Sequence, residues 1–242
     1  MPNVLDSEAT AQVRSRLLHA AKAYEDSGES TYMPQLDPND SNVRVFNLLE
    51  LDPIFRDLIL HPLAVEFVAG LLGEHFMISN FTANIALPGS ESMVLHSDQS
   101  LVAPPPWQAP WSMNIIWCLD DLFAANGATR YLPGSHHFQQ FADVPDNAPQ
   151  QTVAFEAPAG SFVAMDGRMW HTSGANVTQD AERALLFAYY SVDYLRPQAN
   201  WNVVLSTQTQ ASVCPELYQR LGLDAVANTR LAGSLFEPRA EN

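Results

Sequence analysis

The sequence predicts a mainly β protein with flanking helices, built on a double-sheet jelly roll. Apolar residues follow helical spacing in roughly the first 75 residues, and from about residue 76 they alternate with a period of two. The alternating part divides into eight short segments, the number of strands in a double-sheet jelly roll. We expect a single domain over residues 1–242, with a helical support region at 1–75, a jelly-roll core at 76–195 and a C-terminal helix and tail at 196–242.

The first expected element is an amphipathic helix over about residues 6–26. Apolar side chains recur every three or four positions between Leu5 and Tyr24. Asp6 or Ser7 is placed to cap the first turn, because a short polar side chain there can accept hydrogen bonds from free backbone N–H groups.

A polar loop and two short helices complete the N-terminal region. Residues 28–42 contain two prolines and few apolar side chains, a composition typical of a loop. Asp52 and His61 each precede a proline, which is typical of a helix start, and Gly73 follows two leucines as a helix end. We expect both helices to support the core.

The expected strands are short, apolar or β-branched, and separated by clusters of Gly, Pro, Asn or Asp. After residue 195 the sequence predicts one further helix at 215–221, which begins with a proline, and an irregular tail. The eight expected strands are 78–87, 93–98, 112–119, 129–132, 151–156, 161–165, 170–173 and 183–194.

The overall charge limits the partners. The formal net charge is −15 and Lys22 is the only lysine. We therefore expect no nucleic-acid partner and no anionic membrane surface, because both bind clustered basic side chains. The same scarcity of cations disfavours polyphosphate ligands such as coenzyme A esters and favours a small, neutral or weakly charged substrate.

The sequence carries no sign of membrane insertion or export. It has no run of about 18 apolar residues and no basic segment leading into an apolar run at its start, so we expect neither a membrane span nor a signal peptide. Cys118 and Cys214 are far apart in the sequence, which favours two inert thiols over a disulfide. We expect a cytoplasmic monomer or homodimer.

A His-Ser-Asp triplet is the candidate metal site. In an extended segment His96 and Asp98 point to the same face about 6.6 Å apart, close enough to converge on one ion. With seven His and 27 Asp or Glu, chance supplies such a His-x-acid triplet roughly 0.8 times, so the triplet alone is weak. His171 follows a turn and is the expected third ligand by position. Two imidazoles and one carboxylate leave open positions on iron, as non-haem Fe(II) oxygenases require.

Arg183 is the second informative residue. It shares one face of its strand with Phe187 and Tyr189, and an arginine on an inward apolar face needs an anionic partner. The far carboxylate of a metal-bound keto-acid could supply it through two parallel hydrogen bonds. The alternative is a surface ion pair with Asp180 or Glu182.

The order of four sequence blocks adds a family resemblance. The run from Gly127 to His136, Gly-Ala-Thr-Arg-Tyr-Leu-Pro-Gly-Ser-His, comes after the His-Ser-Asp-Gln of 96–99 and before His171 and Arg183. This arrangement resembles the phytanoyl-CoA dioxygenase family of Fe(II)/2-oxoglutarate oxygenases over roughly residues 45–205. The resemblance implies a double-stranded β-helix, the cupin-like form of the jelly roll.

The resemblance also implies a set of site residues. Iron would be held by His96, Asp98 and His171, and the distal carboxylate of 2-oxoglutarate by Arg183 with help from Ser173. Three further positions are possible contacts of the cosubstrate, namely Thr129, Asn84 and Trp117. Asn84 faces the barrel only if its neighbour Ile85 packs outward against the helices, and Trp117 is equally a core residue.

The implied reaction is oxidation by O2 with conversion of 2-oxoglutarate to succinate and CO2. Hydroxylation of a small, non-CoA metabolite, as in natural-product biosynthesis, is the expected outcome; desaturation, epoxidation and rearrangement are variants of it. Asp98 argues against halogenation, which needs that carboxylate replaced. A jelly-roll protein that binds a small molecule without catalysis is the alternative from a different class.

The segment after the triplet is the expected wall of the substrate pocket. Gln99, Trp107 and Trp111 lie in a proline-rich stretch whose indoles offer broad apolar contact. The alternative is a structural loop held by its own aromatic side chains.

The remaining histidines are not expected to bind metal. His136 and His137 follow the triplet too closely for the chain to return to the same site. His19, His61 and His75 lie in helical segments and are expected at the surface or as caps.

Overall fold

Two antiparallel sheets form the core of the protein, in a computed structural model that describes residues 1–28 and 30–224. The larger sheet has the strand order β1-β2-β8-β3-β6 and the smaller one the order β5-β4-β7. The larger sheet consists of β1 (Asn42–Val45), β2 (Phe76–Ala86), β8 (Arg183–Val192), β3 (Ser112–Cys118) and β6 (Phe162–Asp166). The smaller sheet consists of β5 (Val153–Ala154), β4 (Thr129–Tyr131) and β7 (His171–Ser173).

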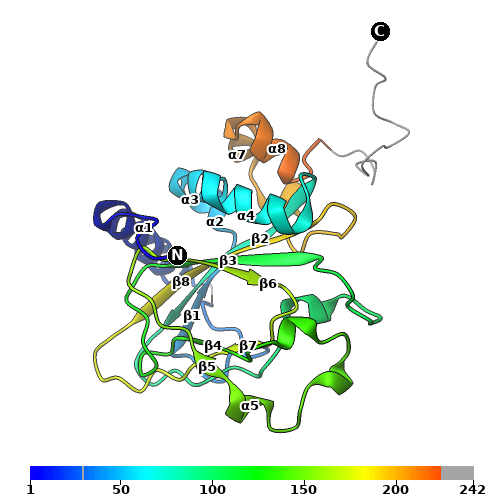
Figure 1. Cartoon of the computed structure of the whole chain (residues 1–242). Coiled ribbons are helices and arrows are strands. Elements are labelled where there is room, and N and C mark those ends of the chain that lie inside the picture. Colours follow the sequence, from blue (N-terminus) through cyan, green and yellow to red (C-terminus); the bar gives the residue numbers. More distant parts are fainter. Residues whose placement is uncertain (29, 225–242) are drawn as a thin grey trace.

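The helices lie mostly on one side of the larger sheet, and the smaller sheet lies on its other side (Figure 1). None of the helices in the described residues is both long and apolar enough to cross a membrane. The helices are α1 (Ser7–Ser27), α2 (Leu48–Leu51), α3 (Pro53–Ile59), α4 (Pro62–Leu72), α5 (Ala148–Gln151), α6 (Trp201–Val204), α7 (Thr207–Ser212) and α8 (Pro215–Arg220).

The predicted helix starts are confirmed by their caps. The side chain of Asp6 accepts a hydrogen bond from the backbone of Ala9 at 2.8 Å, and Asp52 accepts one from Ile54 at 2.9 Å. His61 caps α4 through its ring nitrogen. Each cap satisfies a backbone N–H that has no partner inside its helix, which stabilises the helix by about 1 kcal/mol.

Alternation along the central strands separates the main core from the interior between the sheets. On β2, Phe81, Ala83 and Ile85 belong to the hydrophobic cluster that includes the helices, whereas Asn80, Thr82 and Asn84 face the other way, into a cavity. Successive side chains of a strand point to opposite faces, so one strand serves both purposes. Each large apolar side chain buried under the helices contributes about 1.5–3 kcal/mol to folding.

Three expectations about elements need correction. Residues 93–98 do not form a strand: His96 makes an isolated bridge to His171, and Asp98 begins a short 3-10 helix, Asp98–Leu101. The strand β1 lies inside the region expected to be helical, because its four residues are too few to show a clear alternation. The tail contains α6 and α7 besides the predicted α8, and residues 225–242 of the expected tail lie outside the described residues.

Candidate active site

His96, Asp98 and His171 converge on one point. His96 and His171 face each other as bridge partners, and each backbone N–H donates to the other's carbonyl, at 3.0 and 2.7 Å. Oδ1 of Asp98 lies 3.7 Å from Nε2 of His96 and 3.8 Å from Nε2 of His171. One ligand atom from each of the three lies within 4.8 Å of the others, so one metal ion can contact all three.

Both imidazoles are oriented in the same way. Nδ1 of His96 lies 2.9 Å from the carbonyl oxygen of Val94, and Nδ1 of His171 lies 2.9 Å from that of Met169. A carbonyl oxygen can only accept, so each Nδ1 carries the proton and each Nε2 presents its lone pair to the ion. Burial and the neighbouring His171 lower the pKa of His96, against the opposing effect of Asp98, which favours the neutral imidazole that metals bind.

Asn114 holds the carboxylate ligand in place. Its Nδ2 donates a hydrogen bond of 3.1 Å to Oδ2 of Asp98, which leaves Oδ1 facing the two histidines. The hydroxyl of Tyr189 donates a longer bond, 3.4 Å, to the backbone carbonyl of Asp98. Asn114 was not among the residues expected from sequence, although a lone amide in the mainly apolar strand β3 is a usable signal.

A cavity of about 390 Å³ lies against the triad, between β2 and β8 on one side and the smaller sheet on the other. Arg183, the first residue of β8, lines it and is 1% exposed. Its Nε and Nη2 have no hydrogen-bond partner in the described part of the chain. Burial lowers the pKa of Arg183 to about 10, so the guanidinium stays protonated at neutral pH.

The expected alternative for Arg183 is not what the structure shows. Glu182 pairs instead with Arg14, at 3.0 Å, and no ion pair joins Arg183 to Asp180 within residues 30–224. A buried cation without a protein partner is costly. Nε and Nη2 of Arg183 are therefore available to bind an anion.

A second arginine at the cavity is already neutralised. Nε and Nη2 of Arg44, on β1, bond to Oδ2 and Oδ1 of Asp37 at 2.6 and 2.8 Å. Asp37 is buried in the segment 28–42, for which the sequence predicted a loop and no role in the site. A single arginine in a four-residue strand gave no signal that it would reach the cavity.

Three of the expected cosubstrate contacts line the same cavity as Arg183. They are Asn84 on β2, Thr129 on β4 and Ser173 on β7. Thr129 and Ser173 are direct partners across the smaller sheet, and Asn84 faces inward because its neighbour Ile85 packs under the helices.

Trp117 does not line the cavity. It is fully buried on the helix-facing side of β3, where its ring packs edge-on against His61 and Phe162 with centroids 5.2 and 5.1 Å away. Asn114, an odd number of positions away on the same strand, points to the opposite face, toward the cavity. Of the two readings that the sequence allowed, the core residue is the correct one.

The expected substrate-pocket wall is also corrected. Gln99 is fully buried, and its Oε1 accepts from the backbone of Trp111 at 2.7 Å. Trp107 is 1% exposed and packs edge-on against Phe141. None of Gln99, Trp107 and Trp111 lines the cavity, whereas Ser100 and Leu101 of the same segment do.

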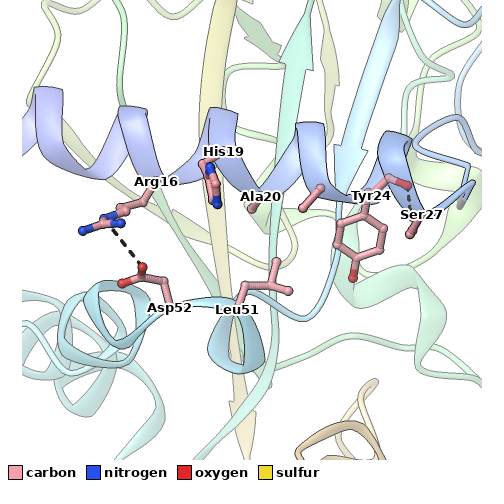
Figure 2. Close-up of a pocket in the computed structure, with 8 residues that line it drawn as sticks. Arg16, His19, Ala20, Tyr24, Ser27, Leu51 and Asp52 are labelled. Carbon is pink, nitrogen blue, oxygen red and sulfur yellow. Dashed lines mark hydrogen bonds and ion pairs between the residues drawn. The ribbon is translucent and has the colours of Figure 1, made fainter.

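The other histidines lie outside the triad. The metal-binding group found in the described residues contains neither His136 nor His137. His19 is exposed on α1 and borders a separate surface hollow beside Leu51, where Arg16 and Asp52 approach to 3.6 Å (Figure 2).

Comparison with known proteins agrees with this geometry. The sequence model of the family described as Phytanoyl-CoA dioxygenase (PhyH) matches residues 1–184. Dioxygenase af480 of Aspergillus fumigatus is 50% identical over 226 residues, which are 93% of this chain and 73% of that protein. The Fe(II)/2-oxoglutarate-dependent dioxygenase nvfF of Aspergillus novofumigatus is 31% identical over 58% of this chain, which spans about half (48%) of nvfF.

A solved structure shows the same fold. HygX from Streptomyces hygroscopicus, crystallised with nickel and 2-oxoglutarate, superposes with a TM-score of 0.65 at 15% identity, over 81% of this chain and 83% of HygX. The expected jelly roll of antiparallel sheets with flanking helices is therefore confirmed.

Proposed function

The chain belongs to the phytanoyl-CoA dioxygenase family, and from this premise we propose that it is an Fe(II)/2-oxoglutarate-dependent dioxygenase that hydroxylates a small, non-CoA metabolite. HygX holds 2-oxoglutarate, and nvfF carries the name of an Fe(II)/2-oxoglutarate enzyme. We further propose that this reaction belongs to natural-product biosynthesis. A cytoplasmic monomer or homodimer without nucleic-acid or membrane partners completes the proposal.

The residues fit these cofactors. Fe(II) and 2-oxoglutarate, when bound, supply oxidation by O2 coupled to release of succinate and CO2. His96, Asp98 and His171 would hold the iron and leave one side open, because the metal-binding group in the described residues has three members and no fourth ligand. Arg183 would bind the distal carboxylate of 2-oxoglutarate, with the hydroxyls of nearby cavity residues as further donors.

One observation carries the proposal: Arg183 is buried in the same cavity as the triad, and its Nε and Nη2 have no hydrogen-bond partner among the described residues. A binding protein with a structural metal has no need of such a cation. An enzyme that must hold a keto-acid dianion beside its iron does, and the bound carboxylate would supply the missing charge and hydrogen bonds.

The protein's part in the reaction is orientation. The fixed histidine tautomers and the Asn114 bond keep the ligand atoms aimed at one point. Arg183, which is 1% exposed, would hold the cosubstrate on the buried side of the cavity and leave the exposed side to the substrate.

Turnover of 2-oxoglutarate tests the proposal. With Fe(II) and O2, the wild type should form succinate, slowly without substrate and faster when a screened metabolite fits. His171→Ala should lose activity by more than about a hundredfold, since even loss of an outer partner of a ligand costs about 10- to 100-fold. His75→Ala, at an exposed histidine, is the matched control and should keep full activity. Absence of succinate from the iron-loaded wild type would support the non-catalytic alternative.

A further inference from the structure

Large apolar side chains are exposed at the mouth of the cavity, beside Gln35 and Gln198. Leu36, Val94 and Leu101 line it and are 46%, 84% and 74% exposed. They come from three separate segments: the loop before β1, the stretch before His96 and the 3-10 helix that begins at Asp98. Large apolar side chains from separate segments gathered around one opening are typical of a surface that an apolar ligand covers.

With the metal and the cosubstrate bound, every charged side chain that lines the cavity would have a partner of opposite charge. The cavity's charged or titratable lining side chains are two arginines, the triad and Tyr189. Arg44 is paired with Asp37, and burial raises the pKa of Tyr189, which keeps its hydroxyl neutral. On the proposed function, the triad holds Fe(II) and Arg183 holds 2-oxoglutarate. No uncompensated charge then faces the substrate from the described residues, and burying an ionised group there would be costly.

One hydrogen-bond acceptor next to the metal site is free. Nδ2 of Asn114 donates to Asp98. Because a carboxylate only accepts, this bond identifies the nitrogen of the Asn114 amide and therefore also its oxygen, Oδ1. Asn114 lines the cavity, and its buried Oδ1 has no hydrogen-bond partner among the described residues. A free acceptor requires a donor, and the simplest uncharged donor on a small molecule is a hydroxyl group.

We propose that the substrate is an uncharged, largely apolar alcohol, whose hydroxyl donates to Oδ1 of Asn114 and whose carbon skeleton lies against Leu36, Val94 and Leu101. This inference rests on the proposed function and names the substrate class of the same site. The three exposed apolar side chains, Leu36, Val94 and Leu101, are called the rim. The inference accounts together for the rim, the absence of an unbalanced charge and the free acceptor.

Binding of an uncharged lipophilic dye tests the rim. Nile red fluorescence is titrated in air-free enzyme loaded with Fe(II) and 2-oxoglutarate. Leu101→Ser and Val94→Ser should each weaken binding by about tenfold, as loss of one apolar contact of this size does. Val203→Ser is the matched control, because Val203 is 77% exposed on α6, outside the cavity lining, and should bind the dye as the wild type does.

Competition against the dye tests the charge and the hydroxyl. Decalin-2-ol should displace Nile red at least about tenfold more effectively than decalin-2-carboxylate, and more effectively than decalin itself. Asn114→Leu should remove the advantage of the alcohol over decalin. Unchanged dye binding in both rim variants, or stronger competition by the carboxylate, would overturn the inference.

The two proposals fail in different ways. If the rim variants keep 2-oxoglutarate turnover and also keep wild-type dye binding, the substrate class is wrong and the oxygenase stands. If the iron-loaded wild type neither binds nor turns over 2-oxoglutarate, the proposed function is wrong, and the substrate inference falls with it.

Discussion

Replacement of Arg183 by methionine should stabilise the protein in the absence of 2-oxoglutarate. Burial lowers the pKa of Arg183 from 12.5 to about 10. The protonated guanidinium is therefore less favourable in the folded than in the unfolded chain by about 3 kcal/mol. This cost is fully present below pH 10 and disappears as the pH rises through 12.5. Imperfect packing of methionine should cost about 1 kcal/mol of this gain. We therefore expect the free energy of unfolding to rise by about 1–2 kcal/mol at neutral pH.

The same substitution should abolish stabilisation by the cosubstrate. With Fe(II), under argon and with 2-oxoglutarate at 100 times its Kd, the wild type should gain about 2.7 kcal/mol in free energy of unfolding. Arg183→Met should gain little, because the distal carboxylate has lost its partner. Urea unfolding with and without 2-oxoglutarate measures both effects.

Arg168→Met is the control for this experiment. Arg168 pairs with Asp166 at 2.7 Å and lies outside the cavity lining, so its loss should leave the gain from 2-oxoglutarate unchanged. The reasoning would be refuted if Arg183→Met lowered stability by several kcal/mol without ligand yet gained as much from 2-oxoglutarate as the wild type.

Three further substitutions test other parts of the site. Asn114→Leu removes the donor to Oδ2 of Asp98 and should weaken Fe(II) binding by about 10- to 100-fold in an air-free metal titration. Asp37→Asn leaves the largely buried Arg44 without its counter-ion and should lower the free energy of unfolding by about 3–5 kcal/mol in urea. Trp117→Phe should cost about 1–2 kcal/mol of stability while leaving the Kd of 2-oxoglutarate unchanged, because Trp117 faces the helices.

Each of these expectations can fail on its own. Unchanged iron affinity in Asn114→Leu would show that Asp98 needs no outer partner. If Asp37→Asn lowered the free energy of unfolding by less than about 1 kcal/mol, the ion pair of Asp37 and Arg44 would contribute no more than an exposed ion pair does. A weaker affinity of Trp117→Phe for 2-oxoglutarate would indicate that Trp117 contacts the cosubstrate.

The fold class could be predicted from periodicity, because successive side chains of a strand that separates a core from a cavity must alternate between the two. On β8, the face that carries Arg183 also carries Phe187 and Tyr189 of the cavity, as expected, whereas Ala184 and Leu186 pack under the helices. Periodicity also decided the orientation of Asn84 once one neighbour was placed. Periodicity could not assign Trp117 to a face of β3, because the composition of this strand is compatible with an indole on either face.

The geometry of the metal ligands was beyond a strand-based prediction. His96 and Asp98 were expected to converge along one strand, but only His96 makes a bridge, and after the extended Ser97 the chain enters a 3-10 helix at Asp98. The short bridge between His96 and His171 depends on two segments far apart in the sequence. Local pattern carries no information about such a pairing, and only the order of the motif blocks pointed to it.

The polar partners of the site were missed for a related reason. The Asp37 and Arg44 pair and the bond from Asn114 to Asp98 each join residues from different elements. Hydrogen-bond partners between elements are fixed by tertiary packing, which the spacing of residues along one element does not encode. Conversely, Trp107 seemed suited to a pocket by residue type, but its loop folds back on itself and buries the indole.

The central claim is that the triad and Arg183 form one site for Fe(II) and 2-oxoglutarate. The most direct test is the visible metal-to-ligand charge-transfer band that forms when 2-oxoglutarate is added to the iron-loaded enzyme without oxygen. The wild type and His75→Ala should show the band at equal intensity, Asp98→Ala should lose it, and Arg183→Met should need far more 2-oxoglutarate to form it. No band in the iron-loaded wild type, or an undiminished band in Asp98→Ala, would contradict the claim.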